Sequence, residues 1–165
     1  MKLRKGFSLL ELMIVIAIAA LLITICSVNS RFLRSSVVQT QLDLFITTCT
    51  YLAQTAIATK TPQTLFLESA DHSYSFHNQK HLLPKGMQFG ILNAVKGPPA
   101  SPTHSVHAPI TFANNTITFW PDGIISSGTV YFLDTSTQAL YAISSGVGHV
   151  SFLRKYRYNG AWHLI

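Results

Sequence analysis

The sequence predicts an α+β fold, with a long N-terminal helix followed by an antiparallel β-sheet head. Three observations predict it. Residues 7–59 contain no glycine or proline, and apolar residues within them recur at helical spacing. Short β-like runs separated by turn residues then follow Pro62. About 135 residues remain after the first apolar segment, which is enough for one compact domain with its own core.

A basic leader containing Lys2, Arg4 and Lys5 precedes an apolar segment that extends from Phe7 to Val28. This segment is 22 residues long and its one charged residue is Glu11. As a helix it would be about 33 Å long, which is enough to cross a hydrocarbon core of about 30 Å. Basic residues before the segment predict a cytoplasmic N-terminus and export of the chain beyond it. We therefore expect residues 7–28 to be a transmembrane segment.

Two simpler interpretations of this segment are a secretory signal peptide and a plain signal anchor. Ala17-Ile18-Ala19 resembles a signal-peptide cleavage site, but apolar residues continue through Val28, beyond a typical signal peptide. A plain anchor accounts for length and orientation and leaves Glu11 unexplained. A carboxylate inside an apolar span costs about 2.5–3.5 kcal/mol on insertion scales, so it requires a role.

The segment Lys5-Gly6-Phe7-Ser8-Leu9-Leu10-Glu11-Leu12-Met13-Ile14-Val15-Ile16 resembles the type III signal of type IV pilins and type II secretion pseudopilins. The resemblance implies that prepilin peptidase removes residues 1–6 by cutting between Gly6 and Phe7, and that Phe7 is then N-methylated. It also implies that Glu11 attracts the Phe7 amine of an incoming subunit. Pairing would relieve two unfavourable charges at once. The implied partners are other pilins or pseudopilins and the inner-membrane assembly platform.

Composition and cysteine content agree with a membrane-anchored structural protein. Of the 165 residues, 48% are hydrophobic and 11% are charged. The net charge of +6 falls to +3 once the three basic residues of the leader are removed, which neither requires nor excludes a nucleic-acid partner. Cys26 and Cys49 are 23 residues apart on one predicted helix, a separation of about 34 Å, so we expect two free thiols.

The apolar segment is expected to continue as a helix over residues 29–60, outside the membrane. One apolar stripe marks the buried side of this part, and its members are Leu42, Phe45, Cys49, Leu52, Ala53 and Ala56. Lys60-Thr61-Pro62 provides the end of the helix. Many major pilins carry a helix-weakening glycine or proline near the membrane exit, whereas this chain has Ala20 and Val28 there. This difference favours a minor subunit.

Residues 61–165 are predicted to form the β-rich head. A first hairpin is expected from Thr64–Leu67 and Tyr74–Phe76, and a third strand from Met87–Ile91. Residues 93–109 hold four of the seven prolines and are expected to be a loop. Further strands are expected at Ile110–Phe112, Thr116–Trp120, Thr129–Leu133, Ala139–Ile143 and Val147–Leu153, with a last aromatic and basic stretch after them.

The second half of the chain resembles the GspH/FimT pseudopilin domain. The segments that carry the resemblance are Phe119–Gly123, Gly128–Leu133, Tyr141–Ser144 and Gly148–Val150. The resemblance implies a minor pseudopilin of type II secretion, near the tip of a short periplasmic pseudopilus, or a minor pilin of type IV pili. The signal and the fold are common to both systems, so these two alternatives stay open.

No catalytic, metal or cofactor site is predicted. His104 and His107 are the one closely spaced histidine pair, and they lie in the proline-rich loop without a cysteine or carboxylate nearby. Gly146-Val147-Gly148 lacks the third glycine of a dinucleotide-binding motif, and no nucleophile elbow is present. We therefore expect a protein that acts by assembly, with no enzymatic turnover.

DNA binding is the alternative role. Arg154, Lys155 and Arg157 alternate with tyrosines, an arrangement that can hold phosphates and stack on bases. Some FimT-like pilins bind DNA through a Gly-Arg-x-Arg tail, but the matching stretch here, residues 148–151, contains neither arginine. Strand alternation would place Arg154 on the opposite face from Lys155 and Arg157. A second explanation is an edge strand protected by charge.

These observations together predict a single-pass protein of the bacterial inner membrane, with a cytoplasmic N-terminus and a periplasmic head. The predicted function is that of a minor pseudopilin of a type II secretion pseudopilus, which supports protein export across the outer membrane. The alternative is a FimT-like minor type IV pilin in pilus biogenesis or DNA uptake.

Overall fold

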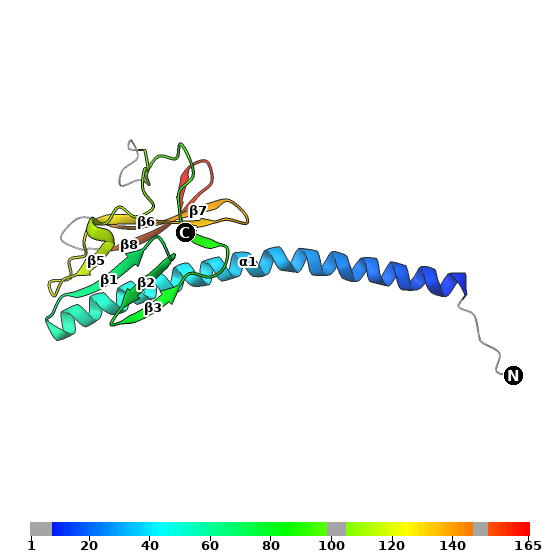
Figure 1. Ribbon diagram of the computed structural model, residues 1–165, viewed down its shortest axis with the longest axis horizontal. Helices are drawn as coiled ribbons and strands as arrows, with labels where there is room; N and C mark the ends of the chain where they lie inside the picture. Colours follow the sequence, from blue (N-terminus) through cyan, green and yellow to red (C-terminus); the bar gives the residue numbers. More distant parts are fainter. Residues whose placement is uncertain (1–7, 99–104, 147–151) are drawn as a thin grey trace. The chain divides into compact units, whose positions relative to one another are not determined.

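A computed structural model describes residues 8–98, 105–146 and 152–165. For residues 25–35 it describes the backbone but not the side chains. The chain divides into two compact units, residues 1–39 and residues 40–165. Helix α1 extends from Leu9 to Thr59 and contributes to both units. Figure 1 labels the helix and most of the strands.

Helix α1 ends where the sequence predicts. Lys60 has a φ of 55°, in the left-handed region that follows many helices, and Pro62 cannot continue the helical hydrogen bonding. The predicted helix end at Lys60-Thr61-Pro62 is therefore confirmed.

The second unit holds two antiparallel sheets. The first has the order β3-β2-β1-β5, and its strands are β1 (Gln63–Glu68), β2 (Ser73–Phe76), β3 (Gln79–Leu82) and β5 (Thr116–Phe119). The second has the order β4-β6-β7-β8-β9, and its strands are β4 (Met87–Phe89), β6 (Gly128–Asp134), β7 (Ala139–Ser145), β8 (Leu153–Tyr158) and β9 (Trp162–Leu164). A short 3-10 turn, η1 (Ala113–Asn115), leads into β5. The predicted α+β class is confirmed.

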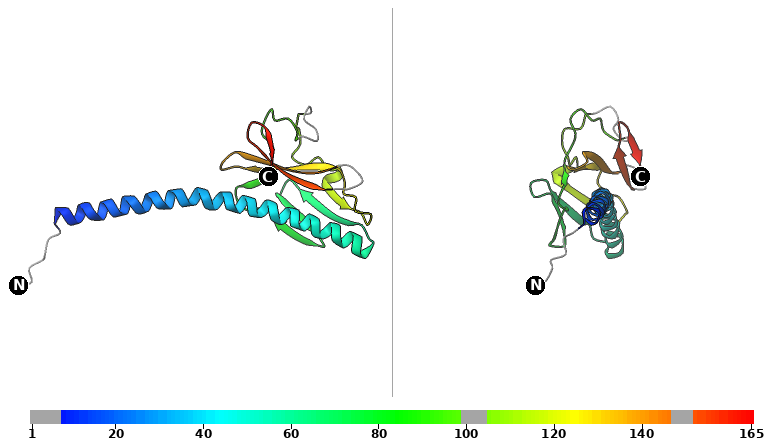
Figure 2. Two further views of the ribbon diagram at one scale, coloured as in Figure 1. Left: turned by 180° about the vertical axis from the view of Figure 1, so that it is seen from behind. Right: turned by 90° about the vertical axis from the view of Figure 1, so that its right-hand side faces the viewer.

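The last turns of α1 pack against both sheets through one apolar stripe. Its fully buried members are Leu42, Phe45, Cys49, Leu52 and Ala56, as predicted, whereas Ala53 is half-buried. The Phe45 ring makes edge-to-face contacts with Tyr74 of the first sheet, at 5.2 Å, and with Phe132 of the second, at 5.3 Å. Figure 2 shows this part of α1 from behind, beside the strands of the same unit. One helical side chain thus joins the two sheets.

The other face of the five-stranded sheet is covered by the loop between β4 and η1. Val95 from this loop is buried with Tyr131, Leu140 and Tyr156 of the sheet, and Val106 packs against them. Within the loop, the Val106 N–H donates to the Val95 carbonyl at 3.1 Å. The described residues of the predicted proline-rich connection, 93–98 and 105–109, therefore form a loop, but one that contributes to the core.

Two strand predictions are wrong. The third strand along the chain is β3, at Gln79–Leu82, and the segment from Met87 forms the fourth. Residues 110–112 form no strand; Ile110 makes an isolated bridge to Val130. The Phe112 ring instead packs over Gly128, where a Cβ atom would lie 2.5 Å from the ring, so this position requires glycine.

Strand β8 also differs from the expectation. It begins at Leu153, and the predicted strand residues 147–151 lie outside the described residues. Because β8 pairs with both β7 and β9, it is an interior strand. The interpretation of its charges as protection of a sheet edge is therefore wrong.

Candidate functional site

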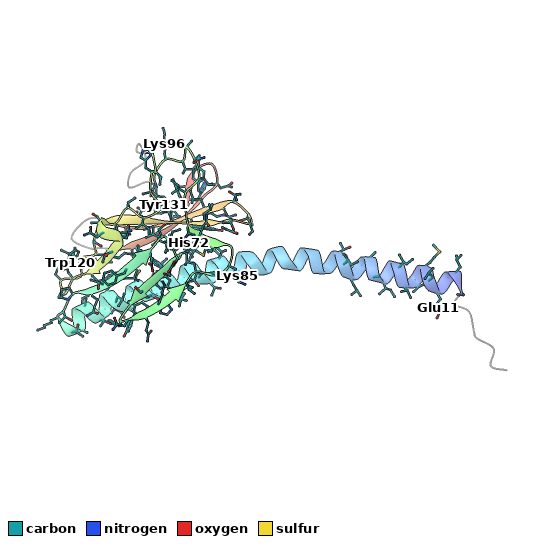
Figure 3. All side chains as sticks on the ribbon, in the orientation of Figure 1. Glu11, His72, Lys85, Lys96, Trp120 and Tyr131 are labelled. Carbon is teal, nitrogen blue, oxygen red and sulfur yellow. The ribbon has the colours of Figure 1, made fainter. Side chains whose placement is uncertain are left out.

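The N-terminal start of α1 has the local structure of a capped helix. The Ser8 hydroxyl accepts a hydrogen bond from the Glu11 N–H at 3.2 Å, and the Ser8 carbonyl accepts one from the Leu12 N–H at 3.2 Å. Glu11 therefore lies in the first helical turn, where the helix dipole favours a carboxylate. Figure 3 shows its side chain projecting from this end of α1. Gly6 and Phe7 lie outside the described residues.

The first turns of α1 expose apolar side chains on every side. The large apolar residues between Leu9 and Ile23 are 51–77% exposed within this unit. The hydroxyl of Thr24, the next residue, donates to the Ala20 carbonyl at 2.7 Å and so does not interrupt the apolar surface. Exposing such a surface to water is unfavourable, by about 25 cal/mol for each Å². It is therefore suited to a surrounding that is itself apolar.

Among the described residues, no helix reaches the length and apolar character that a membrane span requires.

The three basic residues proposed for DNA binding do not form one surface. The Lys155 ammonium lies 2.6 Å from a carboxylate oxygen of Asp43 on α1, on the helix side of the sheet. The Arg154 guanidinium lies 4.3 Å from the centre of the Phe152 ring, and Arg157 lies beside Tyr141, its partner on β7. The expected alternation of strand β8 is thus observed. A polyanion following β8 would meet these cations on two opposite faces.

A cavity of about 590 Å³ lies on the loop side of the same sheet, and sequence reasoning did not predict it. Its walls include Lys96 from the covering loop and two aromatic residues, Tyr158 and Trp162, from the β8–β9 hairpin. The two rings lie 5.2 Å apart, and the indole N–H of Trp162 donates to the Lys96 carbonyl at 2.7 Å. The remaining walls are glycine and alanine residues, which leave room beside the rings.

One sequence signal could have indicated this site. Residues 72–121 and 135–165 contain no aspartate or glutamate, although both segments contain lysine. They supply all the described residues that line the cavity.

No group of three or more potential metal ligands occurs within the described ranges. Of the predicted histidine pair, His104 lies outside these ranges, while His107 is exposed. His81 stacks on Phe76, with ring centres 5.1 Å apart, and His77 shares a hydrogen bond of 2.8 Å with the Gln63 side chain. Both therefore have structural contacts.

This chain has a helix with a serine cap, a carboxylate in its first turn and an apolar surface, followed by antiparallel sheets packed on its last turns. That is the layout of type IV pilin-like proteins. The comparison with protein families agrees: residues 1–27 match the prokaryotic N-terminal methylation motif. No curated protein and no solved structure is detectably similar to the chain. The motif supports a type IV pilin-like or pseudopilin protein and points to a structural, non-enzymatic role. It implies processing by prepilin peptidase and assembly with other pilins.

Proposed function

We propose that this protein is a minor pseudopilin of a type II secretion system. In this proposal, residues 7–28 anchor it in the bacterial inner membrane, residues 29–60 continue the helix, and residues 61–165 form the periplasmic head. The observation that carries the proposal is the methylation motif over residues 1–27, together with the helical turns inside it, residues 9–23, which expose apolar residues all round. An apolar helix of this kind is stable in lipid or among similar helices.

The proposed mechanism is assembly through one charge pair. Cleavage between Gly6 and Phe7 would create an amine at the start of the apolar helix, and Phe7 would then be methylated. A methylated secondary amine stays protonated, so it remains a cation. The Glu11 carboxylate of a neighbouring subunit would pair with it, because both charges are unfavourable in an apolar surrounding when alone. This pairing would fix the axial register of adjacent helices.

The helix cap makes a controlled test of this role feasible. Glu11→Gln removes the charge while retaining the size of the side chain, and Ser8→Ala removes the cap acceptor while retaining the carboxylate. We expect Glu11→Gln to be cleaved and methylated normally, as intact mass would show, but to be depleted from purified pseudopili. Ser8→Ala should be incorporated like the wild type. Equal recovery of Glu11→Gln, or equal depletion of both variants, would contradict the pairing role.

Processing itself is tested at Gly6. Replacing Gly6 with valine should block the peptidase, so the full-length precursor should accumulate on an immunoblot of membranes. A mature chain of normal length in this variant would place the cleavage site elsewhere.

Deletion of the gene would distinguish the secretion system from the alternative, a minor type IV pilin. Under the proposal, normally secreted enzymes should accumulate in the periplasm of the deletion strain, and the wild-type gene should restore their secretion. Normal secretion together with loss of surface pili or of DNA uptake would favour the alternative.

A further inference from the structure

Among the described residues, the edge of the five-stranded sheet has backbone groups with no strand paired to them. Strand β9 is the last strand of this sheet. The Asn159 N–H donates to the Ala161 carbonyl at 2.9 Å, and the Ile165 N–H donates to the Lys155 carbonyl at 3.0 Å. In the β9 segment, the backbone N–H and C=O groups of the odd-numbered residues therefore point toward β8. By alternation, the backbone N–H and C=O groups of Trp162 and Leu164 point away from β8, toward the open edge.

The side chains along this edge are unusually apolar for an exposed strand. Leu164 is 64% exposed and Ile165 is 47% exposed. Natural edge strands are commonly protected by charge, by proline or by bulges. Here the edge instead continues into the cavity lined by Lys96, Tyr158 and Trp162. An incoming strand could therefore place one side chain against the two rings while its backbone pairs with β9.

The charge around this edge selects the chemistry of the occupant. Lys96 is the charged residue among the described walls of the cavity, and residues 135–165, which include β8 and β9, contain no acidic side chain. A segment with aspartate or glutamate would thus meet the Lys96 ammonium and no acidic side chain from β8 or β9. An indole and a phenol side by side also favour an apolar or aromatic residue at the same place.

We propose that β9 and the adjoining cavity bind an extended, acidic segment of another protein, which adds to the sheet as a sixth strand. Backbone pairing at Trp162 and Leu164 supplies affinity, the two rings hold one apolar side chain, and Lys96 selects a neighbouring carboxylate. This site lies on the head, and it does not depend on the assembly role proposed for Glu11.

The observations favour a polypeptide over a nucleic acid. Strong binding of a polyanion requires several cations along one track. On this side of the sheet Lys96 is joined by Arg154, which lies over the Phe152 ring, whereas Lys155 and Arg157 are on the helix side. An open strand edge is complementary to another peptide backbone and offers a nucleic acid no equivalent contact.

The test uses the full chain in detergent micelles and a phage-displayed library of short random peptides. We expect the selected peptides to alternate acidic with apolar residues. One selected peptide, labelled with fluorescein, should bind Lys96→Glu about tenfold more weakly, since charge reversal turns attraction into repulsion. Lys85→Glu, an equal charge change at a separate exposed position on the head (Figure 3), should bind like the wild type.

A second measurement tests strand addition itself. The bound peptide should slow hydrogen exchange of the Trp162 and Leu164 amides. Leu164→Pro removes an N–H that points away from β8 and makes no hydrogen bond to it. The variant should therefore bind the peptide more weakly, while its circular dichroism spectrum should be unchanged. Selected peptides without acidic enrichment, equal losses in both lysine variants, or unchanged amide exchange would overturn the proposal. So would displacement of the peptide by oligothymidine, which would indicate a site for polyanions.

Discussion

Lys155 on β8 and Asp43 on α1 form an ion pair of 2.6 Å between residues that are 112 positions apart in the chain. The two ends of the pair differ in exposure, because the Lys155 side chain is 14% exposed and that of Asp43 is 63% exposed. A residue that the sequence suggested as a DNA contact therefore helps to hold the five-stranded sheet on the helix.

A double-mutant cycle should measure this pair. We expect Lys155→Ala and Asp43→Asn to show a coupling energy of about 0.5–1 kcal/mol, the range for pairs that remain partly in water. The measurement is the free energy of unfolding of the four proteins. Arg154→Ala combined with Asp43→Asn is the control and should be additive, because Arg154 lies over Phe152 instead. Additivity of the Lys155 cycle as well would show that the contact contributes nothing.

Phe45 should be among the most sensitive core positions. Its side chain is 0% exposed and touches an aromatic ring of each sheet, so truncation leaves a cavity between them. We expect Phe45→Ala to lower the free energy of unfolding by about 3–5 kcal/mol. The neighbouring Leu44 is 48% exposed, and Leu44→Ala should change the free energy of unfolding by about 0.5 kcal/mol or less. Similar losses at both positions would contradict the packing described here.

Asp134 should make the free energy of unfolding depend on pH in the acid range. Burial raises the pKa of its carboxyl, but hydrogen bonds from Ser136 and Thr137 outweigh this effect and lower the pKa overall. A lowered pKa in the folded state means that the stabilisation is present above the unfolded pKa of about 3.9 and is lost as the pH falls through the folded value.

Asp134→Asn tests this linkage. The variant should be less stable than the wild type by about 1–2 kcal/mol near neutral pH, since it replaces a hydrogen-bonded charge. The difference in free energy of unfolding should shrink as the pH is lowered through the acid range. A difference that stays constant from neutral to acid pH would mean that the carboxylate charge is not responsible.

Cys49 should be chemically inert in the folded protein. Its side chain is fully buried in the α1 stripe, and this burial raises the pKa of the thiol, so little reactive thiolate forms. In a Cys26→Ser background, iodoacetamide should modify Cys49 only after denaturation, as intact mass would show. Modification of the native protein at the rate of a free thiol would contradict the buried position.

The elements that were predicted correctly depend on local patterns. The spacing of Leu42, Phe45, Cys49 and Leu52 reflects the helical period, and proline ends a helix wherever it occurs. By contrast, β3 was missed because its residues, Gln79 to Leu82, are mostly polar and exposed at a sheet edge. The turn before β3 is formed by His77 and Asn78, both with positive φ, without the glycine that usually marks such a hairpin.

By itself, the sequence determined the segment that carries the methylation motif, since the carboxylate and the apolar run are neighbours along one helix. Only the tertiary structure decided which residues the C-terminal cations and aromatic side chains contact. Lys155 meets Asp43 across 112 positions, and Trp162 meets the Lys96 backbone across 66. Contacts between such distant residues depend on the order of the strands in the sheet, which the side-chain periodicity of each strand does not encode.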